Sequence, residues 1–112
     1  MPYIKTKDGY NVFYGKHNLS SDKPCLFFVH GWMANWSILK PEIEHFRKKG
    51  FPIIYMDIRG HGKSDVLGDK QGFHLDNIAS DMRQIIDELS LKKIVPVGYS
   101  MGGMVSLIFA LK

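Results

Sequence analysis

The sequence predicts an α/β fold in which an antiparallel hairpin precedes a mainly parallel sheet. Two observations support this prediction. Short continuous apolar runs alternate with segments in which apolar residues recur every three or four positions, as in strand-helix-strand units. Of the 112 residues, 45% are hydrophobic and 23% are charged, which describes an ordinary globular chain with at most one domain.

The first two strands are indicated by the dipeptide Asp8-Gly9, which suits a tight turn between segments 3–6 and 10–14. These segments should therefore pair as an antiparallel hairpin. The next segment, 25–29, is continuously apolar, as expected for a strand that is buried on both faces of a sheet.

An amphipathic helix should follow, because Leu39, Ile43 and Phe46 are spaced by four and three residues. Pro41 fits its first turn, where a missing N–H costs nothing. Gly50 lies where a left-handed residue commonly ends a helix.

The rest of the chain continues the alternation. Segment 52–56 is a second buried strand, 57–72 is a polar loop with several glycines, and 78–89 carries the apolar stripe of a second helix. Segment 94–97 is a third buried strand, and 100–111 is a final helix. Pro96 cannot donate a backbone hydrogen bond, so this last strand is expected to pair irregularly or to be short.

The pentapeptide Gly98-Tyr99-Ser100-Met101-Gly102 lies between that strand and the last helix. In a G-x-S-x-G turn, the glycines allow a sharp bend that raises the serine hydroxyl above the sheet. The N–H of the following residue, Met101, then faces a developing oxyanion. The alternative interpretation is an ordinary strand-to-helix turn with Ser100 as a helix N-cap.

The tetrapeptide His30-Gly31-Trp32-Met33 directly follows the strand 25–29 and fits a loop that supplies a second oxyanion donor, the backbone N–H of Trp32. We expect His30 to hold this loop by hydrogen bonds rather than to transfer protons.

The loop from Asp57 contains Gly62-Lys63-Ser64, which looks like the end of a phosphate-binding loop. That motif fails, because Asp57 stands where a glycine is required. A dinucleotide-binding motif fails as well, since Asp65 replaces its third glycine. The expected role is a rigid loop in which Asp57 and Arg59 bond neighbouring backbone. We expect no cofactor, and no Cys/His spacing predicts a metal site.

These three turns, in this order and approximate spacing, resemble the α/β-hydrolase superfamily, and within it the esterase, lipase and perhydrolase branch. The resemblance spans nearly the whole chain. It implies a serine hydrolase that acts on a small-molecule ester or related acyl bond through an acyl-enzyme on Ser100. It also implies that the backbone amides of Trp32 and Met101 form the oxyanion hole.

The family orders its catalytic triad as serine, acid, histidine. All five histidines precede Ser100, and the chain stops inside an apolar helix at Lys112. Residues 1–112 are therefore expected to be the N-terminal portion of a single domain, truncated after the nucleophile helix. We expect this portion to be inactive alone and to associate through the exposed edge of strand 94–97.

Other functions stay open. An acyltransferase, a perhydrolase or a carbon-carbon bond hydrolase would share the same turns, and a non-catalytic binding module would keep the fold without a triad. The net charge is +4, but the basic residues are scattered along the sequence, so no nucleic-acid partner is expected. No run approaches the roughly 18 apolar residues of a membrane span. The lone Cys25 and the lack of a signal peptide favour the cytoplasm.

Overall fold

The computed structural model describes residues 2–66 and 74–111, so part of the expected loop 57–72 lies outside the described residues. None of the helices in these two ranges combines the length and apolar character needed to cross a bilayer. In chain order the elements are β1 (Tyr3–Lys5), β2 (Asn11–His17), β3 (Cys25–Val29), the 3-10 helix η1 (Trp36–Leu39), α1 (Lys40–Lys48), β4 (Ile53–Met56), α2 (Leu75–Glu88), β5 (Ile94–Gly98) and α3 (Met101–Leu111).

The described strands form one sheet in the order β1-β2-β4-β3-β5. β2 pairs antiparallel with both β1 and β4, whereas β3 pairs parallel with β4 and β5. β2 therefore opposes the other four strands in direction. The α/β class, the initial hairpin and the parallel part of the sheet are as predicted.

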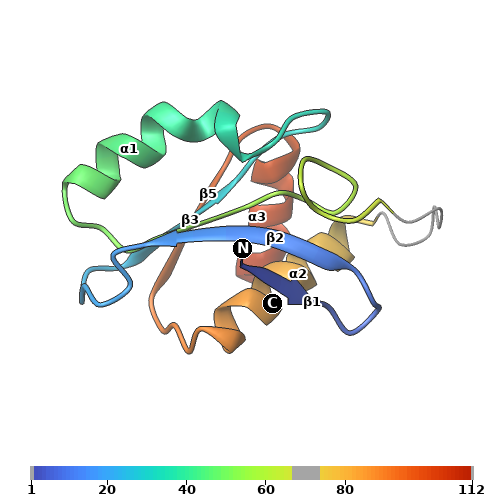
Figure 1. Cartoon of the computed structure of the whole chain (residues 1–112), viewed down its shortest axis with the longest axis horizontal. Helices are drawn as coiled ribbons and strands as arrows, with labels where there is room; N and C mark the ends of the chain where they lie inside the picture. The colour runs from blue at the N-terminus through green and yellow to red at the C-terminus, as the bar shows by residue number, and fades with distance from the viewer. Residues whose placement is uncertain (1, 67–73, 112) are drawn as a thin grey trace.

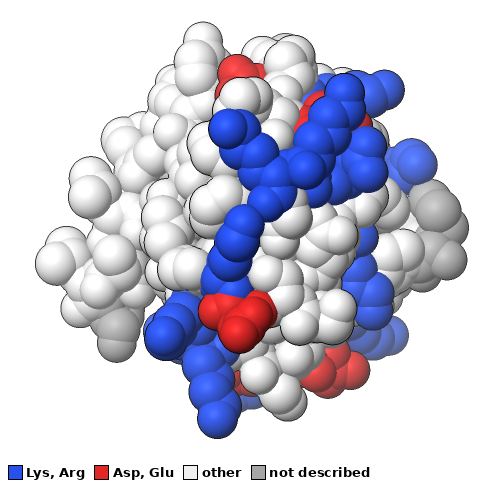
Figure 2. All heavy atoms as spheres, turned by 90° about the vertical axis from the view of Figure 1, so that its left-hand side faces the viewer, with Lys and Arg blue, Asp and Glu red and all other residues white. Residues whose placement is uncertain are grey.

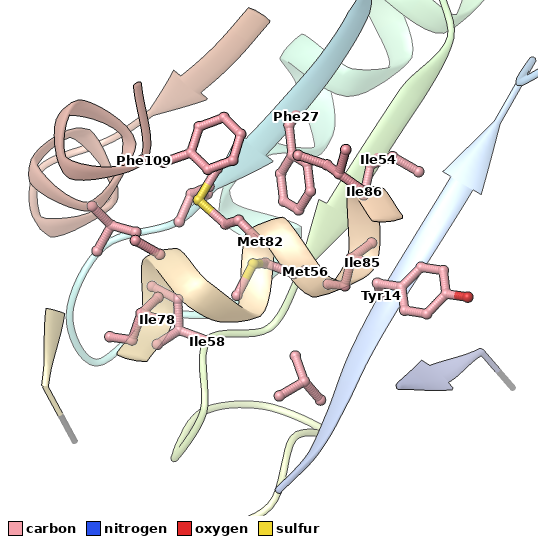
Figure 3. Packing of buried hydrophobic residues seen from close by; sticks show 14 of the residues in the cluster. Tyr14, Phe27, Ile54, Met56, Ile58, Ile78, Met82, Ile85, Ile86 and Phe109 are labelled. Atoms are coloured by element: carbon pink, nitrogen blue, oxygen red, sulfur yellow. The ribbon is translucent and has the colours of Figure 1, made fainter. Parts of the chain in front are cut away.

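Helices cover both faces of this sheet, with α1 on one side and α2 and α3 on the other (Figure 1). β3 is buried throughout, which explains its continuous apolar run. Its residues alternate between two cores. Phe27 packs with Ile54, Met82 and other residues on the α2 and α3 side (Figure 3), whereas Phe28 belongs to the cluster on the α1 side.

Helix α1 begins and ends as its residues predict. Pro41 lies in the first turn, and Gly50 adopts a left-handed φ of 83° just after the helix. The preceding turn η1 was not expected. Asn35 caps it, since the Asn35 side chain accepts a hydrogen bond from the Ser37 N–H at 2.9 Å. The periodic Leu39 consequently ends η1 rather than lying within α1.

The expectation of irregular pairing at Pro96 was wrong, because Pro96 pairs in register with Phe27 within a continuous five-residue strand. The reason lies in the alternation of amide directions along a strand. The Tyr99 N–H donates to Val29 O of β3 at 3.0 Å. Three residues earlier, position 96 directs its missing amide away from β3, so no hydrogen bond to β3 is lost.

The end of the sheet at which the parallel strands begin is rich in basic side chains. Figure 2 shows Lys and Arg across this end, with acidic side chains among them. Lys23, Lys92 and Lys93 line a surface depression there, and the Lys23 ammonium bonds Lys49 O at 2.8 Å. Lysines distant in sequence thus gather at the end opposite the carboxyl ends of these strands.

Candidate active site

The carboxyl ends of β3, β4 and β5 each continue into one of the three turns singled out from the sequence. Because these strands are parallel neighbours, the turns emerge at the same edge of the sheet. In open α/β sheets, this edge is where ligands bind.

Ser100 forms the junction between β5 and α3 and adopts a left-handed φ of 56°. A non-glycine residue in this region stores roughly 1–3 kcal/mol of strain, which surrounding contacts must offset. Two contacts fix the bend on either side of the serine: the Tyr99 N–H bonds Val29 O, and the Gly103 N–H bonds Ser100 O at 2.8 Å. Ser100 itself is exposed. The backbone thus has the sharp turn predicted from G-x-S-x-G.

Both glycines of the pentapeptide are required by close approach of main chains. A Cβ at Gly98 would overlap the carbonyl group of Gly102, and a Cβ at Gly102 would overlap the carbonyl oxygen of Val29. Any larger residue would separate α3 from β3 and β5. These contacts set the position of the helix that carries Ser100 at its start.

The loop after β3 lies directly against this turn. A Cβ built at Gly31 would stand 3.2 Å from Tyr99 O and 3.3 Å from Ser100 Cβ. The structure therefore brings the predicted oxyanion loop beside the predicted nucleophile. The Trp32 side chain is 57% exposed, as expected for a residue at the rim of a site.

Met101, the other predicted oxyanion donor, is buried and begins α3. The first N–H groups of an α-helix have no acceptor within the helix, and they carry its partial positive charge. The Met101 amide is thus of the kind that can receive an oxyanion. Its position directly after Ser100 places it next to the candidate nucleophile.

His30 forms the loop hydrogen bonds expected of it. The fully buried ring accepts the Ile58 N–H at Nε2, at 2.9 Å, and its Nδ1 lies 2.7 Å from Gly31 O. Because an amide only donates, Nε2 must be the acceptor and Nδ1 must carry the proton. Burial lowers the pKa of His30 below its ordinary 6.5, which favours this neutral form.

Asp57 also has its predicted role in the loop after β4. Its buried carboxylate accepts the Trp36 N–H at 2.8 Å and the Lys63 N–H at 2.9 Å. It thereby joins the start of η1 to the turn at residues 60–63. Backbone N–H groups thus bond both oxygens of the Asp57 carboxylate. A phosphate-binding loop would need a glycine at position 57.

The sequence did not predict that the Arg59 side chain bonds two carboxylates. Arg59 is 1% exposed and forms two hydrogen bonds to each of two carboxylates, those of Asp81 and Asp8, at 2.7–3.0 Å. Its guanidinium also lies 4.0 Å from the centre of the Tyr10 ring. A buried guanidinium needs charged acceptors more than carbonyls, and the fold brings these acceptors from the hairpin and α2. The Arg59 bonds lower the pKa of Asp8 to about 2.

His61 was not singled out from the sequence, yet it joins the loops. Its Nε2 accepts the Met33 N–H at 3.1 Å, and its Nδ1 lies 3.1 Å from Arg59 O. Its ring centroid is 5.4 Å from the Trp32 ring and 5.2 Å from that of His30. Together with residues of both loops, His61 lines a shallow depression of about 320 Å³. No sequence spacing signals these contacts, since they bridge separate strands.

Among the residues that the structure describes, no group of three His, Cys, Asp or Glu side chains is arranged to bind a metal ion. What the site offers is an exposed hydroxyl on a strained turn beside a glycine-containing loop.

Comparisons with known proteins agree with this arrangement. The chain is 37% identical over 103 residues to a bifunctional esterase/perhydrolase of Acinetobacter calcoaceticus, covering 92% of this chain and 36% of that protein. It is 34% identical to a non-heme chloroperoxidase of Burkholderia pyrrocinia, with the same coverage. Among solved structures, an esterase from Exiguobacterium antarcticum superposes with a TM-score of 0.87 at 28% identity, over 98% of this chain and 39% of that one.

The chain therefore spans little more than a third of the length of these relatives. Other similar proteins are epoxide hydrolases, so the relatives share a fold and differ in reaction. The model of the alpha/beta hydrolase fold matches residues 24–112, which include all three turns of the candidate site. With this match over most of its length, the chain belongs to the α/β-hydrolase superfamily.

Proposed function

We propose that these residues are the N-terminal part of a single α/β-hydrolase domain, and that the full-length parent is a serine hydrolase of carboxylic esters or related acyl bonds. The observation that carries this proposal is the strained, exposed Ser100 with Gly31 packed beside it. Strain at a residue that contributes little to packing is a sign of function.

In the proposed reaction, Ser100 Oγ attacks the acyl carbonyl carbon while a base removes its proton. The carbonyl oxygen becomes negative and accepts hydrogen bonds from the Trp32 and Met101 amides. The intermediate then expels the alcohol, which takes up the proton, and leaves an ester on Ser100. Water hydrolyses that ester, releasing the acid and restoring the hydroxyl.

We place the base and its acid partner in the parent beyond residue 112. His30 and His61 are unsuitable, because backbone groups occupy both nitrogens of each ring. His17 lies at the opposite end of the sheet, paired with Ile53 at the start of β4. His74 accepts the Asp76 N–H at the start of α2, and His45 packs against Phe46 in α1.

Perhydrolysis is a second candidate, favoured by the 37% identity to a bifunctional esterase/perhydrolase. The acyl-enzyme would be the same. Hydrogen peroxide would replace water as the nucleophile, so that the released product is a peracid instead of a carboxylic acid. Transfer to another acceptor, carbon-carbon bond hydrolysis and a non-catalytic binding module are the remaining alternatives.

The test is to treat the full-length parent with a fluorophosphonate probe and with short-chain p-nitrophenyl esters. Labelling and turnover should both occur and should both be lost in Ser100→Ala. A matched variant, Ser106→Ala, removes a hydroxyl that lies buried in α3 and should leave both intact. Peroxide added to the ester assay should yield peracid if the second candidate holds. Labelling that persists in Ser100→Ala would refute the assignment of the nucleophile, and a folded parent without labelling would favour the binding module.

Residues 1–112 without the rest of the parent have an unpaired strand edge at β5 among the described strands. β5 has β3 on one side and no other described strand on its second side. We expect residues 1–112 to associate through this edge, and we expect a cytoplasmic location, since the buried Cys25 is a free thiol.

A further inference from the structure

The peptide that carries the Trp32 N–H is held from its carbonyl side. His30 Nδ1–H donates to Gly31 O, which belongs to the same peptide unit as the Trp32 amide. In a trans peptide the carbonyl and the N–H point in opposite directions. Fixing Gly31 O therefore fixes the direction of the Trp32 N–H. The orientation of Trp32 also depends on the next peptide unit, the one between Trp32 and Met33.

That next unit is held by His61. The Met33 N–H, which closes the Trp32–Met33 peptide, donates to His61 Nε2 at 3.1 Å. Nε2 must be unprotonated to accept, so Nδ1 carries the proton and donates to Arg59 O at 3.1 Å. The ring thus connects the loop after β3 to the loop after β4.

The backbone at Met33 makes this bond necessary. Met33 adopts a left-handed φ of 61°, which is unfavourable for its side chain, and that side chain is 80% exposed. The exposed side chain offers little packing to offset the strain. The hydrogen bond to His61 and the edge-on contact between the His61 and Trp32 rings both stabilise this conformation.

We propose that His61 is a positioning residue of the oxyanion hole: by accepting the Met33 N–H, it holds Trp32 in the conformation that aims the Trp32 amide at the oxyanion. This inference rests on the proposed function. His61 touches neither the substrate nor the reacting atoms in this role. Its contribution is realised in the transition state, where the oxygen carries its charge, so its loss lowers kcat and leaves KM nearly unchanged.

Three substitutions of His61 in the full-length parent test whether the hydrogen-bond acceptor at the position of Nε2 is what matters. His61→Gln keeps an acceptor oxygen at about the reach of Nε2. His61→Asn has the same amide group but is too short to reach Met33, and His61→Phe keeps the ring without either nitrogen. We expect Asn and Phe to lower kcat on a p-nitrophenyl ester roughly 10- to 100-fold, as for a misplaced donor, and Gln to stay within about threefold of wild type.

Amide exchange provides a second readout that does not depend on turnover. The Met33 N–H should exchange faster in His61→Asn and His61→Phe than in wild type, and it should stay protected in His61→Gln. A role confined to folding would instead lower the melting temperature in step with kcat in all three variants. It would give Gln no advantage over Asn.

Failure of this inference and failure of the proposed function give different results. If turnover depends on Ser100 but is unchanged in folded His61→Asn and His61→Phe, the positioning role is refuted and the nucleophile stands. The same holds if Gln is as impaired as Asn, or if Met33 exchange is alike in all variants. If wild-type turnover is absent or persists in Ser100→Ala, the proposed function fails, and the role of His61 in an oxyanion hole fails with it.

Discussion

Gly102 of α3 lies so close to the carbonyl group of Val29 in β3 that position 102 has no space for a side chain. The neighbouring Gly103 is different, since a Cβ there would lie 3.6 Å from its nearest contact, Gly98 O. Two adjacent glycines in one helix thus have different reasons to be glycine.

We therefore expect Gly102→Ala to destabilise the full-length protein by about 2–3 kcal/mol, because α3 must shift away from β3. Gly103→Ala is the matched control. It should be neutral, or stabilising by up to about 1 kcal/mol, since alanine is the better helix former. Urea unfolding of both variants measures this difference, and equal destabilisation would contradict the close approach at residue 102.

The second prediction concerns the strain at Ser100. Glycine adopts a left-handed φ without steric cost, so Ser100→Gly should raise the free energy of unfolding by about 1 kcal/mol while abolishing turnover. Ser100→Ala should abolish turnover without this gain, because it retains the Cβ. Thermal or urea unfolding of the two variants gives the comparison. A Ser100→Gly protein no more stable than Ser100→Ala would mean that the turn is not strained.

Much of this site was predictable because its chemistry is local in sequence. The run 25–29 is apolar on both faces of the sheet, and the G-x-S-x-G residues create their own bend. The partners of Arg59 and His61 were not predictable. Arg59 bonds carboxylates 51 and 22 residues away, and His61 bonds an amide 28 residues away. Such contacts depend on how β3, β4 and the hairpin are placed in the sheet. The spacing of apolar residues in the sequence does not predict that placement.

Pro96 illustrates the same limit within a strand. The sequence shows that Pro96 lacks a backbone N–H. Only the register shows which neighbouring strand that N–H would have faced. In this sheet the missing donor faces away from β3, so the proline costs no bond with that strand.

The third prediction is a pH dependence of stability that His30 causes. Burial lowers the pKa of folded His30 below its ordinary 6.5, so the unfolded chain binds the proton more readily. The resulting stabilisation is fully present above about pH 6.5 and declines as the pH falls toward the folded pKa. The slope contributed by this one group is at most about 1.4 kcal/mol per pH unit.

Urea unfolding of the full-length protein between pH 7.5 and pH 5 measures the dependence, and His30→Gln, which cannot titrate, should show a shallower one. If that variant does not fold, NMR titration of the His30 ring in the wild type answers the question directly. A ring that titrates at 6.5 or above in the folded protein would contradict the prediction.

The last prediction is that residues 1–112 alone neither catalyse nor remain monomeric. For catalysis, backbone groups occupy both ring nitrogens of His30 and His61, and His17 lies at the opposite end of the sheet, so none of these three can activate Ser100. For association, β5 lies at the end of the described sheet. Beside it, α3 exposes a stripe at the helical spacing of three and four residues, formed by Met104, Leu107 and Leu111.

Size-exclusion chromatography with light scattering should show dimers or larger species whose fraction rises with concentration. Leu107→Glu places a charge in the stripe and should shift the population toward monomer. Ile38→Glu is the control, because Ile38 is also half exposed but belongs to η1, beside α1 on the other face of the sheet. A monomer that unfolds cooperatively would refute the association, and ester turnover that depends on Ser100 in this chain would refute the need for a base from elsewhere.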